Sequence, residues 1–166
     1  MKKIKNSRVD LEVFSNTFNQ LCRNTRLLQT RAYSHHFGTS LLRHSVNVAY
    51  VSVFISKLLR LKIDYLQLTR GALLHDYYLY DCHDKNEVNK KHHLRQHPAK
   101  AVLAAQEDLF LTKKEIDIII KHMFPITLAL PKTKESAIVC LSDKVCSIYE
   151  LFTNLYKKAY RRLSFA

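Results

Sequence analysis

Glycine, proline and tryptophan are scarce in this sequence of 166 residues, which holds two glycines, three prolines and no tryptophan. Tight hairpins and short strands need glycine and proline at their turns, so their scarcity argues against a β-rich protein and favours helices. A hydrophobic content of 47% is enough for one sizeable core. We therefore predict a single all-α domain spanning residues 1–166, built from about six helices.

Several targeting and redox signals are also missing. No apolar run is long enough to cross a bilayer, and the Met-Lys-Lys start is not followed by the apolar segment of a signal peptide. No two of the four cysteines (Cys22, Cys82, Cys140 and Cys146) form a CxxC pair. Cys140 and Cys146 fall in an apolar helical pattern, where a thiol acts as a small hydrophobic group. We expect a soluble, cytoplasmic protein without a membrane partner.

Acidic residues are outnumbered by basic ones, 14 against 27, which leaves a formal net charge of +13. Such a charge attracts nucleic acid, anionic lipid or an anionic small substrate. The basic residues are scattered, with small clusters at residues 2–5, 90–91 and 157–162. Charge alone therefore selects no partner, and a solvated basic surface explains it equally well.

Apolar periodicity and capping residues outline the first three helices. An N-terminal helix is expected over residues 10–29, and a second over residues 41–59, which is apolar nearly all round and should be buried. Asp64 is a plausible N-cap for a third helix that continues to about Tyr80. A polar loop should follow it.

The remaining helices carry similar signals. Pro98 suits the first turn of a fourth helix, and Thr112 with Glu115 has the spacing of a capping box that begins a fifth, ending near Met123. A last helix should begin near Thr133. Its apolar stripe, at steps of three and four residues, is interpreted as core. The stripe consists of Leu141, Val145, Ile148, Phe152, Leu155 and Ala159.

Polar ligand-type residues interrupt three of these apolar patterns. His44 lies within the second helix, His75 and Asp76 follow the apolar run of the third, and Asp143 lies in the stripe of the last. A buried carboxylate must be paired, hydrogen-bonded or bound to metal, because desolvating it alone is costly. Each residue alone could be a hydrogen-bonded core residue. One metal ion would satisfy all four, which predicts a metal site.

The same order resembles the HD-domain superfamily of metal-dependent phosphohydrolases, in which a histidine precedes a His-Asp pair and a distant aspartate. The resemblance covers residues 36–150 and depends on three stretches of sequence. These are Leu-Leu-Arg-His-Ser-Val at 41–46, Gly-Ala-Leu-Leu-His-Asp at 71–76 and Leu-Ser-Asp-Lys-Val at 141–145. It implies an HD-type helical bundle.

His97 and His122, between the His-Asp pair and Asp143, resemble the extra ligands of two-metal members such as the HD-GYP type. The resemblance then implies that His97 and His122 bind a second ion, with Asp76 bridging it to the first. Alternatively, His97 merely precedes a helix and His122 is a cation in its last turn.

Some family patterns are absent. Tyr-Tyr-Leu at 77–79 replaces the Ile-Gly-Lys that follows the pair in many members, and Met-Phe-Pro at 123–125 replaces Gly-Tyr-Pro. A cyclic-dinucleotide phosphodiesterase is therefore disfavoured. The stretch Leu-Tyr-Asp-Cys-His at 79–83 is more similar to a group of small, stand-alone bacterial HD proteins.

Further site residues follow from their proximity to these ligands. We assign catalytic roles to Asp76, His36 and Lys144. The substrate-binding candidates are the polar and basic residues nearest the ligands, namely Arg31, His36, Arg43, Asp81, His83 and Lys121. His35, His92 and His93 lie in polar or basic surroundings and are interpreted as surface residues.

The function predicted from these residues is hydrolysis of a small phosphate ester or nucleotide by a metal-activated water. One or two divalent ions should bind, and imidazole with carboxylate suits iron, manganese, zinc or nickel, with magnesium as a further option. Two alternatives stay open. One is a non-catalytic HD module that binds metal or a nucleotide, and the other is a nucleic-acid-binding protein.

Overall fold

The computed structural model describes residues 2–35, 38–80 and 90–164, and these fold into an all-α bundle, as predicted. The only pairing of β type in this part of the chain is an isolated bridge between Ser34 and Ser40. The described residues form six α-helices and one 3-10 helix, η1. Their bounds are α1 Lys2–Asn24, η1 Leu27–Ala32, α2 Leu41–Leu58, α3 Tyr65–Leu74, α4 Lys90–Asp108, α5 Lys113–Lys121 and α6 Lys134–Ser164.

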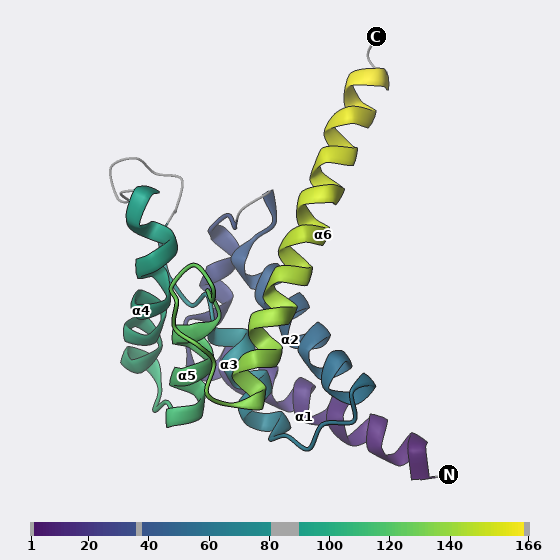
Figure 1. Ribbon diagram of the computed structural model, residues 1–166, viewed down its shortest axis with the longest axis vertical. Coiled ribbons are helices and arrows are strands. Elements are labelled where there is room, and N and C mark those ends of the chain that lie inside the picture. The colour runs from purple at the N-terminus through teal and green to yellow at the C-terminus, as the bar shows by residue number, and fades with distance from the viewer. Residues whose placement is uncertain (1, 36–37, 81–89, 165–166) are drawn as a thin grey trace.

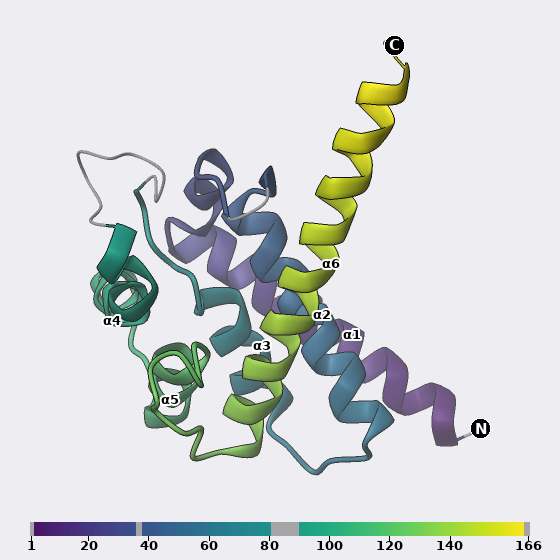
Figure 2. The same cartoon turned by 45° about the horizontal axis from the view of Figure 1, so that its top comes forward.

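Helix α3 lies in the centre of the bundle, packed against α1, α2, α5 and α6 (Figure 1). Helix α2 also packs on α6, while α4 covers the outside of α5. The C-terminal part of α6 projects beyond the body in both views (Figures 1 and 2). The described chain contains no helix that combines the length and the apolar character needed to cross a membrane.

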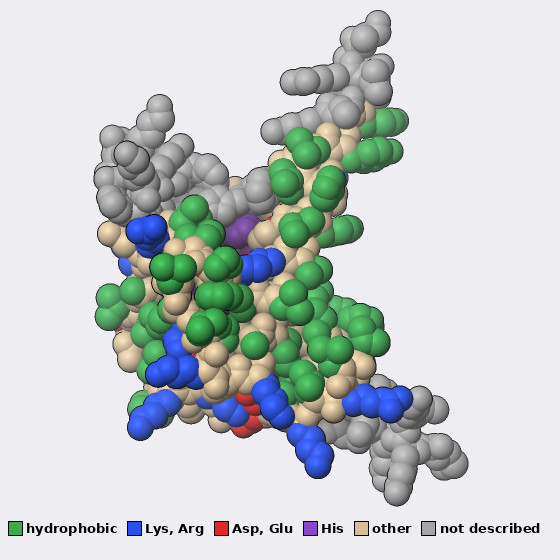
Figure 3. Space-filling model, in the orientation of Figure 1, with side chains coloured by type: hydrophobic (Ala, Val, Ile, Leu, Met, Phe, Trp, Pro, Cys, Tyr) green, Lys and Arg blue, Asp and Glu red, His purple; other side chains and the backbone are tan. Residues whose placement is uncertain are grey.

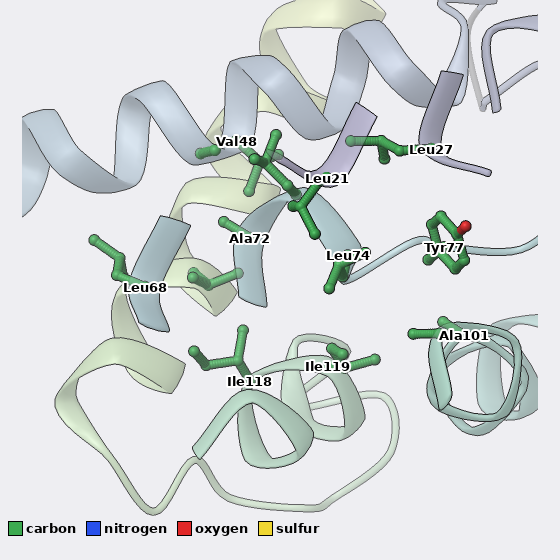
Figure 4. Packing of buried hydrophobic residues seen from close by; sticks show 14 of the residues in the cluster. Leu21, Leu27, Val48, Leu68, Ala72, Leu74, Tyr77, Ala101, Ile118 and Ile119 are labelled. Carbon is green, nitrogen blue, oxygen red and sulfur yellow. The ribbon is translucent and has the colours of Figure 1, made fainter. Parts of the chain in front are cut away.

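The core gathers around α3 (Figure 4). Leu21 of α1, Val48 of α2, Ala72 of α3 and Ile118 of α5 belong to one buried cluster. Gly71 lets α3 and α5 approach closely, since a Cβ there would lie 2.6 Å from Cδ1 of Ile118. This packing presents the C-terminal end of α3 to both α5 and α6.

Several predicted local signals are confirmed. The Asp64 side chain accepts a hydrogen bond from the backbone N–H of Gln67 at the start of α3. Thr112 and Glu115 form the expected capping box at α5. Cys140 is buried, as its apolar pattern indicated.

The boundaries of three helices differ from the predictions. Helix α1 runs from Lys2 to Asn24 instead of over residues 10–29 and is followed by η1, and α3 ends at Leu74 instead of near Tyr80. The chain turns after α3, which lets Tyr77 enter the main core and Tyr78 pack in a smaller cluster with Leu41. Pro98 lies inside α4, not in its first turn. Its φ is compatible with a helix, so the helix loses one hydrogen bond there but continues.

The predicted burial of the last helix's stripe is wrong. Leu141, Val145, Ile148, Phe152 and Leu155 are 45% to 65% exposed, and the side chain of Ala159 is outside the described part. Helix α6 packs on the body with its opposite face, which carries the buried residues of the helix. The second helix is also buried on one side only, because Tyr50, Phe54 and Leu58 of α2 are exposed.

Candidate metal centre

Three helices bring the first group of predicted ligands together. His44 comes from the first turn of α2, His75 and Asp76 from the end of α3, and Asp143 from α6. Oδ1 of Asp143 lies 3.1 Å from Nε2 of His44 and 3.8 Å from Nε2 of His75. Oδ2 of Asp76 lies 3.5 Å from the same His75 nitrogen. All four residues are buried.

A second group meets the other oxygen of the same aspartate. Oδ1 of Asp76 lies 3.2 Å from Nε2 of His97 on α4 and 3.5 Å from Nε2 of His122, which caps the end of α5. The two imidazole nitrogens are 2.9 Å apart. One carboxylate therefore faces both groups, each oxygen toward a different one.

Backbone carbonyls determine which nitrogens face inward. Nδ1 of His75 lies 2.8 Å from the carbonyl of Ala72, and Nδ1 of His122 lies 2.7 Å from the carbonyl of Ile119. A carbonyl only accepts, so Nδ1 donates the proton and the neutral ring has its lone pair on Nε2. The buried Nε2 of His75 has no hydrogen-bond partner in the described chain. Lone pairs and carboxylate oxygens thus converge, and a cation between them would satisfy both.

Burial and neighbouring charges strongly shift the pKa values of the buried predicted ligands. Burial lowers the pKa of His75, and it lowers the pKa of His122 to about 3. Burial raises the pKa of Asp76 and Asp143, but the surrounding histidines outweigh it and lower both values. For His44, burial lowers the pKa, yet hydrogen bonds to Asp143 and a second carboxylate raise it to about 10. Ionised carboxylates and neutral imidazoles are the donors that borderline divalent metals prefer, and His44 becomes such a donor once it releases its proton.

Comparison with known proteins agrees with this arrangement. The family description "HD domain" matches residues 41–148, a span that contains all six predicted ligands and well over half of the chain. The chain belongs to the HD-domain family. It is therefore a member of a superfamily of metal-dependent hydrolases, and the recognition of the family from its sequence is confirmed. No curated protein and no solved structure matches the chain.

Two residues that had no predicted role also lie at this candidate metal centre, beside His44. His35, interpreted as a surface residue, is buried, and its ring stacks on His44 with centroids 3.7 Å apart. Nε2 of His35 lies 3.5 Å from Oδ2 of Asp76. Glu150 lies 3.1 Å from Nδ1 of His44 and 3.5 Å from Nδ1 of His35. The surface interpretation of His35 is therefore wrong.

The sequence carries a signal for the position of Glu150 but none for that of His35. Glu150 follows Asp143 by two helical turns, which puts both carboxylates on the same face of α6. His35 lies in the segment between η1 and α2, where no periodic pattern predicts which side chains point inward.

The candidate metal centre opens to a cavity of about 200 Å³ lined by His35, Asp76, His97, His122 and Lys144, among others. Figure 3 shows a histidine side chain, in purple, in the hollow beside α6. Nζ of Lys144 donates hydrogen bonds to the carbonyls of His122 and Cys140, at 2.9 and 3.1 Å. A fixed positive charge thus lies in the wall beside the carboxylates.

The other predicted residues lie away from this cavity or outside the described part of the chain. Arg31 and Arg43 line a separate cavity of about 770 Å³, between the start of α2 and α6. Lys121 forms an ion pair with Asp117 at 2.8 Å and does not line the metal cavity. His36, Asp81 and His83, and the side chains of His92 and His93, lie outside the described residues.

Proposed function

We propose that this HD-domain protein is a phosphohydrolase that cleaves a small phosphate ester or nucleotide at a dinuclear metal centre. The carboxylate of Asp76 supports this most directly, because one oxygen faces His75 and the other faces His97 and His122. A bridging carboxylate between two histidine-containing groups suits a pair of ions that acts on one phosphoryl group.

The donor atoms have suitable spacing for metal. Ligands about 2.1 Å from a common ion lie roughly 3–4 Å apart, and the contacts of Asp143 with His44 and His75 are 3.1 and 3.8 Å. In this proposal, His44, His75, Asp76 and Asp143 bind the first ion, and His97, His122 and Asp76 bind the second. The imidazole-rich second group favours iron, manganese, zinc or nickel over magnesium.

Bound metal would lower the pKa of a coordinated water and neutralise phosphate oxygens. The chain's own residues position the substrate. Lys144 holds its charge at the cavity wall, where it attracts the phosphate group. The cavity of about 200 Å³ holds a phosphate with a few further atoms, so a larger ester would extend outward through the opening. This size favours a phosphate group at the end of a small molecule.

Hydrolysis by the metal-reconstituted protein tests this proposal. A panel of phosphomonoesters, nucleotides and cyclic nucleotides should contain a substrate for the wild type, and Asp76→Asn should abolish its turnover. Asp117→Asn is the matched control, because Asp117 is paired with Lys121 away from the cavity, and it should keep activity. Turnover that persists in Asp76→Asn would refute the mechanism. A metal-loaded wild type that hydrolyses nothing in the panel would instead indicate a non-catalytic metal-binding module.

A further inference from the structure

Helix α6 presents a large uncovered apolar surface to solvent. We define its outer face by Leu141, Val145, Ile148, Phe152 and Leu155, each of which is at least 45% exposed. Exposed tyrosines widen this face at Tyr149, Tyr156 and Tyr160. In Figure 3, hydrophobic side chains follow α6 from the body to its projecting part. A contiguous patch of this kind on a folded chain marks an interaction site.

The spacing along the outer face indicates what covers it. Its members follow one another at steps of four, three, four and three residues, the 3.5-residue repeat of helices that pack side by side with interlocking side chains. At 31 residues, α6 is about 46 Å long. The complementary surface is therefore another long helix with the same repeat, and a second copy of α6 supplies one.

Charge distribution favours a protein over a lipid surface. Between Leu141 and Tyr156 the only charged residues are Asp143, Lys144 and Glu150. Asp143 and Glu150 contact His44 on the buried side of the helix. Lys144, at the flank of the helix, is bonded to the carbonyls of His122 and Cys140. A helix that lies on a membrane has lysine and arginine along the side facing away from the lipid. From Ser142 to Asn154 that side of α6 is buried or half-buried against the body.

The exposed area is sufficient for a stable dimer. An aromatic side chain buries 150–250 Å², so Tyr149, Phe152, Tyr156 and Tyr160, which are 62% to 71% exposed, offer roughly 400–700 Å² together. The aliphatic members of the outer face bring the total near the ~800 Å² that each partner buries in a standard interface.

From the repeat, the charge distribution and the area, we infer that this protein is a dimer in which the outer face of α6 packs against the outer face of α6 in a second copy, antiparallel to it. In a parallel pair the basic segments at positions 157–162 of the two copies would lie at the same level along the helices. In an antiparallel pair centred near residue 150 they are roughly 25 Å apart, beyond the screening length at physiological salt. This inference is independent of the proposed hydrolytic activity.

The mass of the full chain in solution tests the dimer. Sedimentation equilibrium over about 1–100 μM should give twice the chain mass for the wild type. Ile148→Glu with Phe152→Glu should shift the protein to a monomer, because two carboxylates from each copy would be desolvated in the interface without partners. Leu103→Glu is the matched control, since Leu103 on α4 is 63% exposed and lies away from α6, and it should stay dimeric.

Two further measurements separate dimerisation from misfolding and from lipid binding. The double variant should keep the helical content and metal content of the wild type, since its positions face away from the metal centre. If it loses helix, Phe152→Ser alone should still weaken dimerisation at least tenfold. A wild type that stays monomeric across the concentration range would overturn the inference. So would a monomer that binds anionic phosphatidylserine vesicles but not neutral ones, which would identify the outer face as a lipid-binding surface.

Discussion

Glu150 provides a sensitive test of how the metal centre is built, because it touches a predicted ligand without being one of the six. Its carboxylate lies 3.1 and 3.2 Å from Nδ1 of His44, whose Nε2 faces Asp143. A carboxylate that accepts the Nδ1 proton fixes the ring orientation and makes Nε2 a better donor to metal. We predict that Glu150→Gln weakens metal binding while leaving the helical fold intact.

The contact between Glu150 and His44 sets the expected loss of metal affinity. Loss of such an outer carboxylate typically costs 10- to 100-fold in metal affinity. Glutamine keeps the shape and one accepting oxygen, so we expect about a tenfold loss, equivalent to about 1.4 kcal/mol. The loss of charge also weakens the binding of the proton that His44 holds in the metal-free protein. That effect offsets part of the loss, which places the expected value at the lower end of the range.

Competition with a chelator of known affinity measures this loss on the purified protein. Glu150→Ala, which removes the acceptor entirely, should fall toward a hundredfold loss. Glu12→Gln on the exposed side of α1 serves as the control and should bind metal as the wild type does. If Glu150→Gln binds metal within twofold of wild type, the carboxylate does not position His44 and the argument is refuted.

Three other predictions concern packing and protonation. Gly71→Ala should lower the free energy of unfolding by roughly 1–2 kcal/mol in thermal denaturation, because its Cβ would lie 2.6 Å from Cδ1 of Ile118, a cost that exceeds the gain in helix propensity. Adding Ile118→Ala should cost less than the sum of the single changes, and strict additivity would contradict this. Burial raises the pKa of Asp108, but hydrogen bonds from Arg26 outweigh it and lower the value. The stabilisation is thus present above the unfolded pKa and lost as pH falls through the folded one. Asp108→Asn should therefore destabilise the protein by about 1 kcal/mol at neutral pH but much less in acid, as urea denaturation at both pH values can measure. Because the pKa of His44 is raised to about 10, metal binding should release about one proton from it, and affinity should rise roughly tenfold per pH unit near neutrality. A titration in buffers of different ionisation enthalpy counts that proton, and a pH-independent affinity would contradict the assignment.

Features with strong local signals could be predicted from sequence. The caps at Asp64 and Thr112 depend on neighbouring backbone groups, so their spacing along the chain was sufficient. His44 and Asp143 stood out because each interrupts an apolar pattern. Their convergence with His75 then follows from the mutual packing of α2, α3 and α6.

Features that depend on tertiary contacts could not be predicted from the sequence. His35 belongs to an irregular segment, and it is buried through tertiary contacts with His44, Asp76 and Glu150. The apolar stripe of α6 illustrates another limit. Periodicity identifies which residues share a face, but it does not tell whether the same chain covers that face. Here the covered face carries Asp143 and Glu150, and Phe152 on the other side is exposed.

The metal content of the untagged protein tests the central claim most directly. After reconstitution with iron, manganese or zinc, elemental analysis should find about two ions per chain in the wild type and about one in the His97→Ala, His122→Ala double variant. That result would establish two metal sites in each chain, one of which depends on His97 and His122. A wild type that retains no metal under any of these conditions would contradict the account of the site and the hydrolysis proposed from it.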